Sequence, residues 1–171
     1  MSKAFTRESD DEGSPSRRPL PPSPLPPGAR NYITPGGARR LREALQRLEE
    51  QCRPQEGKDG ASVSEARQAA EFRIAQIRRS LHSAVVVEPA SDGAERIRFG
   101  ASVIVRGRAE EESVFRIVGV DETDIDRGWV SWLSPVAKAL LNARVGDRVA
   151  FRFPTGEDVL EVVRITYESP E

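Results

Sequence analysis

The chain has 171 residues, of which 37% are hydrophobic and 31% charged, and its formal net charge is −1. Such a length suits one or two small domains and excludes a large multidomain enzyme. Apolar runs stay short of the ~18 residues that a membrane span requires, and the first residues lack the apolar core of a secretory signal, so we expect a cytoplasmic protein without a membrane partner. The single cysteine, Cys52, cannot form an internal disulfide, as is usual in a reducing compartment.

The near-neutral total charge hides opposite charges on the two parts of the chain. Residues 30–82 carry eleven Lys/Arg against seven Asp/Glu, whereas residues 83–171 carry eleven against sixteen. A basic segment joined to an acidic one is typical of a protein that docks on a partner and reaches toward a polyanion.

Residues 1–30 hold seven of the thirteen prolines and show no apolar periodicity. Proline fixes φ and lacks an amide donor, so the run at 19–27 favours extended polyproline II. We expect residues 1–30 to form a stiff, disordered tail; the alternative is a Pro-rich ligand for an aromatic groove.

A first helix is predicted to begin at Thr34-Pro35. Threonine can accept hydrogen bonds from the free amides at a helix start, and proline suits the first helical position. The helix should end at Arg53-Pro54, because the residue before proline disfavours the helical conformation. Apolar residues recur along it at heptad spacing: Ala38, Leu41, Leu45, Leu48 and Cys52.

A second helix is predicted from about Ser62 to Leu81, with Ser62 and Glu65 in capping-box positions. Its apolar residues form a matching seam: Val63, Ala66, Ala70, Ile74, Ile77 and Leu81. Two such helices joined by a short turn should pack antiparallel. On the first helix we expect Glu49 to pair with Arg53, four residues further on.

Beyond residue 83 the apolar pattern changes to period two, which predicts strands. The predicted strands are Ala84–Val87, Ala101–Arg106, Val114–Val120, Trp129–Leu133, Arg148–Phe153 and Val159–Tyr167. A short helix should follow Ser134-Pro135, over Val136–Leu141. We therefore expect an α+β chain, with a helical hairpin at 31–83 and, over 84–171, an antiparallel sheet packed on one short helix.

Residues that could carry catalytic chemistry are few. His82, the only histidine, lies at the end of the second helix, where a cation favours the helix dipole, and Cys52 lies on the apolar seam. The sequence contains no Ser/His/Asp set, no nucleotide-binding glycine loop and no metal-ligand cluster. We expect no catalytic residue, no metal and no cofactor, and therefore not an enzyme.

Two charged groups are candidates for contact with a partner. The acidic turn Asp121-Glu122-Thr123-Asp124 is either solvated or a docking edge for a basic partner. Arginines along the helices either face solvent with Glu partners or follow the phosphates of RNA or DNA, and the sequence leaves both interpretations open. The arginines that we consider for nucleic-acid contact are Arg39, Arg42, Arg53 and Arg67.

Six segments, in their order and spacing, resemble the bacterial Gre transcript-cleavage factors, GreA and GreB. The segments are Gly37–Leu45 (GARRLREAL), Phe99–Val103 (FGASV), Phe115–Glu122 (FRIVGVDE), Ser134–Leu141 (SPVAKALL), Val145–Val149 (VGDRV) and Glu161–Tyr167 (EVVRITY). The resemblance covers roughly 31–168, and its C-terminal part is the more specific.

The resemblance implies an N-terminal antiparallel coiled coil and a C-terminal FKBP-like domain. It also implies that the globular domain binds the rim of the RNA polymerase secondary channel while the coiled coil enters the channel. Carboxylates at the tip then help to hold a catalytic Mg²⁺, and the polymerase hydrolyses backtracked RNA. By position, Asp121, Glu122, Ser134 and Pro135 match the polymerase-binding region.

At the tip the sequence departs from that family. Its members carry a segment like Gly-Asp-(Leu/Arg)-x-Glu-Asn-Ala, whereas residues 53–64 here read RPQEGKDGASVS, which leaves Glu56 and Asp59 as candidate tip carboxylates. The hairpin is also about fifteen residues short, which removes roughly 11 Å of reach when split over two helices at ~1.5 Å per residue. We therefore expect a monomeric polymerase-binding factor that modulates elongation without stimulating cleavage, with nascent RNA as a further contact.

Three alternatives stay open at this point. An active cleavage factor would use Asp59 or Glu56 at the hairpin tip. An FKBP-like prolyl isomerase or chaperone would need an aromatic-lined pocket, yet most of the few aromatic residues in the C-terminal half should be core. A direct binder of RNA or DNA would use the arginines of the hairpin.

Overall fold

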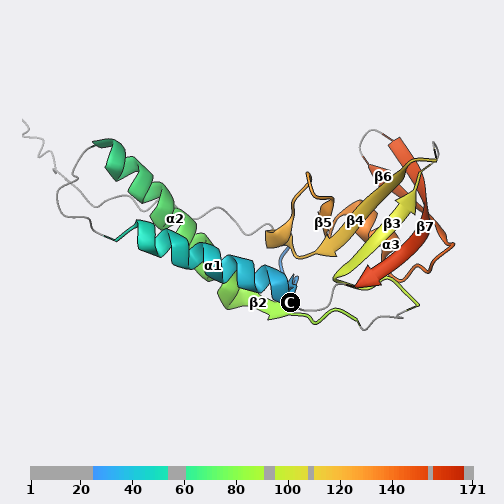
Figure 1. Ribbon diagram of the computed structural model, residues 1–171, viewed down its shortest axis with the longest axis horizontal. Coiled ribbons are helices and arrows are strands. Elements are labelled where there is room, and N and C mark those ends of the chain that lie inside the picture. Colours follow the sequence, from blue (N-terminus) through green and yellow to red (C-terminus); the bar gives the residue numbers. More distant parts are fainter. Residues whose placement is uncertain (1–24, 54–60, 91–94, 108–109, 154–155, 168–171) are drawn as a thin grey trace, which may run out of the picture.

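The computed structural model describes residues 25–53, 61–90, 95–107, 110–153 and 156–167. Two helices form an elongated arm, and a five-stranded sheet with one short helix forms a head at its end (Figure 1). This mixture of helix and sheet confirms the α+β class. The disorder expected for the tail falls, up to residue 24, outside the described residues.

The arm consists of α1 (Pro35–Gln51) and α2 (Ala61–Ser83), which run side by side in opposite directions (Figure 1). Thr34 caps α1 as predicted: its Oγ1 accepts a hydrogen bond from Gly37 N at 3.0 Å. An ion pair joins the two helices, with Arg78 Nη2 at 2.7 Å from Glu49 Oε1. The expected pairing of Glu49 with Arg53 on the same helix is therefore wrong, because the second helix offers a closer guanidinium.

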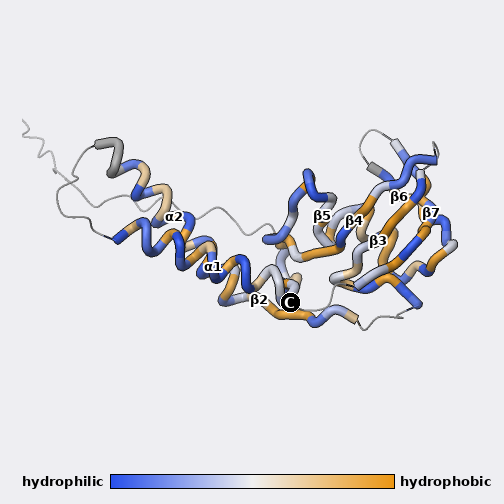
Figure 2. Tube along the Cα trace, in the orientation of Figure 1, coloured by the Kyte–Doolittle hydropathy of each residue, from blue (hydrophilic) through white to orange (hydrophobic). Residues whose placement is uncertain are grey.

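The apolar seam of the arm is well buried only near the head. Ala38 of α1 and Ile74 and Ile77 of α2 are buried, whereas Ala66, predicted on the seam, is exposed. The remaining seam positions of α1 are half-buried: Leu41, Leu45, Leu48 and Cys52. A pair of helices without a further layer leaves much of each helix in water, and Figure 2 shows the arm as largely hydrophilic. Among the described helices none is long and apolar enough to cross a membrane.

A small parallel sheet lies at the base of the arm. β1 (Asn31–Ile33) enters α1, β2 (Ala84–Val86) leaves α2, and the two pair in parallel. The sequence pattern predicts a strand at Ala84–Val87 but places it in the C-terminal sheet, which is wrong. β1 was not predicted, because three residues are too few to show a period.

The head contains a five-stranded sheet in the order β5-β4-β3-β7-β6. Its strands are β3 (Ala101–Arg106), β4 (Glu112–Val118), β5 (Trp129–Ser131), β6 (Arg148–Phe153) and β7 (Gly156–Tyr167). Neighbouring strands are antiparallel except for β4 and β5, which pair in parallel. The expectation of a wholly antiparallel sheet is wrong at this edge, because the connection through the 3-10 turn η1 (Val120–Glu122) crosses back before β5 begins.

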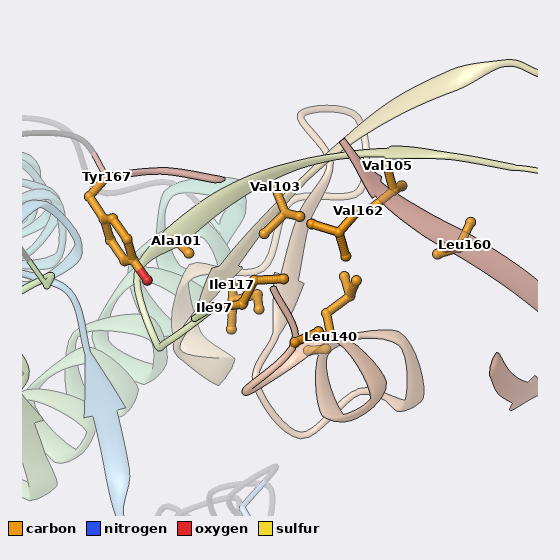
Figure 3. Close-up of a cluster of buried hydrophobic side chains, with 11 residues drawn as sticks. Ile97, Ala101, Val103, Val105, Ile117, Leu140, Leu160, Val162 and Tyr167 are labelled. Carbon is orange, nitrogen blue, oxygen red and sulfur yellow. The ribbon is translucent and has the colours of Figure 1, made fainter. Parts of the chain in front are cut away.

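The core of the head lies between the sheet and α3 (Pro135–Leu140) (Figure 3). β3 alternates as predicted, with Ala101, Val103 and Val105 completely buried. Leu140 of α3 packs into this cluster from the helix side. The core therefore holds α3 in place, and α3 begins at two of the candidate docking residues, its cap Ser134 and Pro135.

Tyr167 closes one end of this core, and we expect its hydroxyl to contribute measurably to stability. The hydroxyl donates to Arg96 O at 2.9 Å and accepts from Arg98 N at 3.0 Å. Tyr167→Phe leaves a partly buried amide without its acceptor, so the free energy of unfolding in urea should fall by about 1–2 kcal/mol. A change below about 0.3 kcal/mol would contradict this account, because typical hydrogen bonds contribute more.

Tyr167 also makes the stability of the folded state depend on pH. Burial raises the pKa of the Tyr167 phenol above its ordinary value. The folded state therefore favours the neutral phenol, so this contribution to stability is complete below about pH 10 and is lost as the pH rises through the raised value. Tyr167→Phe should flatten the alkaline part of the stability profile.

Candidate partner-binding site at the joint of arm and head

A buried carboxylate, Glu122, joins the arm to the head. Its side chain is 1% exposed and lies at the end of η1, against the start of α1. Oε2 accepts hydrogen bonds from Thr34 N at 2.8 Å and from Gly119 N at 3.1 Å. Oε1 accepts from Thr34 Oγ1 at 2.5 Å and from Arg40 Nη2 at 3.1 Å. These four donors come from both the arm and the head, and together they offset the penalty of burying a charge.

Two glycines make room for this carboxylate. A Cβ on Gly37 would lie 1.9 Å from Glu122 Oε1. A Cβ on Gly119 would lie 2.2 Å from Tyr32 O and 3.0 Å from Glu122 Oε2. Real Cβ atoms do not approach other atoms so closely, so the joint requires glycine at both positions.

Further contacts around β1 extend the joint. The buried Asn31 places its Nδ2 3.2 Å from Asp121 Oδ2 of η1. The same atom lies 3.2 Å from two acceptors at the end of α2, Ser80 O and Ser83 Oγ. On the neighbouring residue, the Tyr32 ring packs edge-on against Trp132 of the head, with 5.3 Å between ring centroids. Polar and aromatic contacts thus hold the base of the arm on the head.

The four residues assigned to polymerase binding do not share one environment. Ser134 is half-buried and caps α3, with its Oγ accepting from Ala137 N at 3.2 Å, and Pro135 is exposed beside it. Asp121 is half-buried and contacts Asn31. Glu122 is buried and fully engaged in the joint, so its carboxylate is not presented at the surface.

Three arginines surround Trp129, the first residue of β5. The guanidinium Cζ atoms of Arg40, Arg116 and Arg127 lie 4.6, 5.1 and 5.3 Å from the centroid of its indole ring. They come from α1, from β4 and from the turn between η1 and β5, respectively. We call these four residues the arginine cluster. A tryptophan face attracts cations, which helps to hold like charges together here.

The arginines considered for nucleic-acid contact all lie on the arm and are exposed. Arg67 pairs with Glu71 one turn away, with 3.1 Å between Nε and Oε1. Arg39 and Arg42 lie on α1, and Arg53 follows its C-terminal cap. The structure therefore spreads these four side chains along the arm.

Four further residues stand out in the sequence: Cys52, Glu56, Asp59 and His82. Glu56 and Asp59, the candidate tip carboxylates, lie outside the described residues. Cys52 is half-buried at the end of α1, and His82 is exposed in the last turn of α2. Within the described ranges, no group of three or more His, Cys, Asp or Glu side chains is arranged to hold a metal.

Comparisons with known proteins identify the family. The family model described as "Transcription elongation factor, GreA/GreB, C-term" matches residues 91–167. Transcription elongation factor GreB of Neisseria meningitidis serogroup A is 33% identical over an alignment of 155 residues, in which 81% of this chain and 94% of that protein are covered. GreA of Halorhodospira halophila is 35% identical over 153 residues, covering 80% and 97%. The crystal structure of GreA factor homolog 1 (Gfh1) of Thermus thermophilus covers 81% of this chain and 99% of its own at 24% identity and a TM-score of 0.39.

A match over 81% of the chain is longer than the head and therefore takes in part of the arm as well. On the strength of the two sequence matches, the chain belongs to the GreA/GreB family of transcription elongation factors. The resemblance found in the sequence is thereby confirmed. The 155 aligned positions of the GreB match exceed the roughly 139 residues that 81% of this 171-residue chain represents, so about 16 positions have no counterpart here.

Proposed function

We propose that this protein binds RNA polymerase through its head, carries its arm into the secondary channel and modulates elongation without stimulating transcript cleavage. The observation that carries the proposal is the length of the arm. α1 has 17 residues and α2 has 23, which correspond to about 26 Å and about 35 Å at ~1.5 Å per residue. About 16 positions of the alignment with GreB have no counterpart in this chain, a number close to the fifteen or so residues by which we infer the hairpin to be shortened.

Arm length matters because a carboxylate acts on Mg²⁺ only from ligand distance, ~2.0–2.1 Å. A hairpin shortened by about fifteen residues ends roughly 11 Å short of the position that a full-length hairpin reaches. The turn sequence lacks a Glu-Asn-Ala segment as well. An arm of this kind can occupy the channel and still leave the metal site of the polymerase without an added ligand.

We assign docking to Asp121, Ser134 and Pro135, which lie near one another in sequence on either side of β5. Glu122 is excluded from this set because its buried carboxylate is engaged in the joint. In this proposal, residues 31–83 form a coiled-coil domain and residues 84–171 an FKBP-like domain. The exposed arginines Arg39, Arg42, Arg53 and Arg67 face the nascent RNA, and the protein acts as a monomer.

A competition assay tests this proposal. Core RNA polymerase stalled in a backtracked complex is cleaved with an active GreA, and increasing amounts of this protein are added. We expect this protein to co-purify with the core polymerase and to slow the GreA-dependent cleavage, because both factors need the same channel. Absence of any association with the polymerase in gel filtration or pull-down would refute the proposal.

A further inference from the structure

The buried side chain of Asn31 connects the base of the arm to a candidate docking residue. Asn31 is 4% exposed, and its Nδ2 lies 3.2 Å from Asp121 Oδ2 in η1. The same nitrogen lies 3.2 Å from Ser80 O and 3.2 Å from Ser83 Oγ, at the end of α2. The backbone of Asn31 is fixed as well, because β1 pairs with β2 at the base of the arm and places Asn31 opposite Ala84 (Figure 1). Asn31 is therefore held by the arm and reaches from there to the head.

The amide of Asn31 is better suited to hold a neighbouring group than to fill a buried position. An amide nitrogen carries two protons, whereas three acceptors surround Nδ2 of Asn31. The carbonyl oxygen of the same side chain is buried and accepts no hydrogen bond from the described residues. A buried acceptor without a partner is unfavourable, and a leucine of nearly the same shape would avoid it. What the amide provides is its donor, and of the three acceptors only Asp121 belongs to the head.

The carboxylate of Asp121 has no counter-charge within the described ranges. Glu122 and Asp124, in the same acidic turn, each form an ion pair with an arginine. Asp121 forms none with a described lysine or arginine, and its carboxylate accepts one hydrogen bond from these residues, from the neutral amide of Asn31. That bond engages Asp121 Oδ2, whereas Asp121 Oδ1 is left without a protein partner and is not buried. A carboxylate oriented at one oxygen and open at the other suits a hydrogen bond from a cationic side chain.

We propose that Asn31 is a positioning residue, which holds the Asp121 carboxylate ready for a lysine or arginine side chain of RNA polymerase. The inference rests on the proposed function for the identity of the partner, and it names the chemistry of one contact that the polymerase makes. An unrestrained aspartate would lose side-chain freedom when such an ion pair forms, which weakens binding. Because the hydrogen bond from Asn31 restricts Asp121 in the free protein, less of that freedom is left to lose.

Binding of the full-length chain to immobilised core polymerase tests the proposal. Asp121→Ala removes the carboxylate and should raise the dissociation constant about ten-fold. Asn31→Leu keeps the buried shape but removes the donor, and should raise the dissociation constant about five-fold. The matched control is Gln46→Leu on α1, where an exposed amide Nε2 donates to Glu50 Oε1 at 3.1 Å. The control removes an amide from a carboxylate far from Asp121 in the sequence and should bind within about two-fold of wild type.

The double variant distinguishes positioning of Asp121 from a general structural role of Asn31. If Asn31 acts through Asp121, Asn31→Leu should change the dissociation constant by less than about two-fold in a protein that already carries Asp121→Ala. The two substitutions would then not be additive in free energy. If their effects multiply instead, so that the double variant binds about fifty-fold more weakly than wild type, Asn31 acts independently of Asp121 and the inference is refuted.

The charge of the contact is tested by Asp121→Asn, which keeps an acceptor oxygen for Asn31 and another polar atom for the partner. We expect this variant to bind about as weakly as Asp121→Ala, because a lysine or arginine binds a carboxylate more strongly than a neutral amide. Binding of Asp121→Asn at wild-type strength would overturn the assignment of a cationic partner.

The outcomes separate this inference from the proposed function. Circular dichroism melts establish that each variant is folded at the temperature of the binding assay, and Asn31→Ala, which adds no bulk, repeats the measurement in case leucine does not fit the joint. If the wild-type chain does not bind the polymerase, the proposed function fails and the inference fails with it. If the wild type binds and the folded Asn31 variants bind equally well, only the inference is refuted.

Discussion

Glu122→Ala is expected to lower the free energy of unfolding by about 3 kcal/mol, because buried donors then lose their acceptor while a partly buried arginine loses its counter-charge. The affected donors are Thr34 N, Thr34 Oγ1 and Gly119 N, and the arginine is Arg40. The arm should also lose its fixed position on the head, since these bonds bridge the two. Urea unfolding followed by tryptophan fluorescence measures the first effect, because Trp129 and Trp132 both lie near the joint.

Two further variants sharpen this test. Glu122→Gln keeps the shape of the side chain but replaces one acceptor oxygen with an amide donor, so we expect an effect between those of wild type and alanine. Glu157→Ala removes an exposed carboxylate that pairs with Arg152 and should change stability by less than about 0.5 kcal/mol. A Glu122→Ala protein as stable as the Glu157→Ala control would contradict the role of the joint.

Gly37→Ala should be nearly as disruptive as the loss of Glu122, although it adds only one methyl group. That methyl group would lie 1.9 Å from Glu122 Oε1, so the carboxylate must leave its hydrogen bonds or α1 must move away from the head. Overpacking of this kind typically costs about 1–3 kcal/mol, to which the displaced hydrogen bonds add. Thermal and urea unfolding of the variant give the magnitude.

The adjacent glycine provides the control. A Cβ on Gly36 would lie 3.2 Å from Arg40 Nη1, at the mobile end of a long side chain that can yield. Alanine is a better helix former than glycine by up to about 1 kcal/mol, so Gly36→Ala should be neutral or stabilising. If Gly37→Ala destabilises the protein while Gly36→Ala does not, then glycine is required at position 37 because of the close packing in the joint and not because of helix propensity. A Gly37→Ala protein as stable as Gly36→Ala would refute the close packing described here.

Local sequence patterns predict the elements that are determined by residues close together in the sequence. Thr34 caps α1 as expected, and the bounds of β3 and β6 agree with the alternation of apolar residues. Partners distant in sequence were missed. The ion pair of Glu49 with Arg78 needs the second helix, and the parallel pairing of β4 with β5 depends on the turn between them.

The candidate site likewise combines residues that the sequence singles out with contacts that only the structure reveals. The motif around Asp121 and Glu122 was singled out, but the two neighbours have different surroundings, and only the structure reveals that Glu122 is buried against α1. The arginine cluster could not be predicted, because its members are distributed over three elements that no periodicity connects. A glutamate in an acidic turn, close in the fold to a Gly-Gly pair, carries no local signal of burial. Such sites are assembled by tertiary packing.

The central claim is that the arm enters the polymerase channel without supplying a ligand to its metal. The direct measurement is the length of the labelled transcript in purified backtracked complexes after this protein alone is added at a concentration that saturates the polymerase. We predict binding with no shortening of the transcript, at a level equal to the intrinsic cleavage without any factor. Rapid shortening that disappears in Asp59→Ala would contradict the claim and show that the tip still reaches the metal.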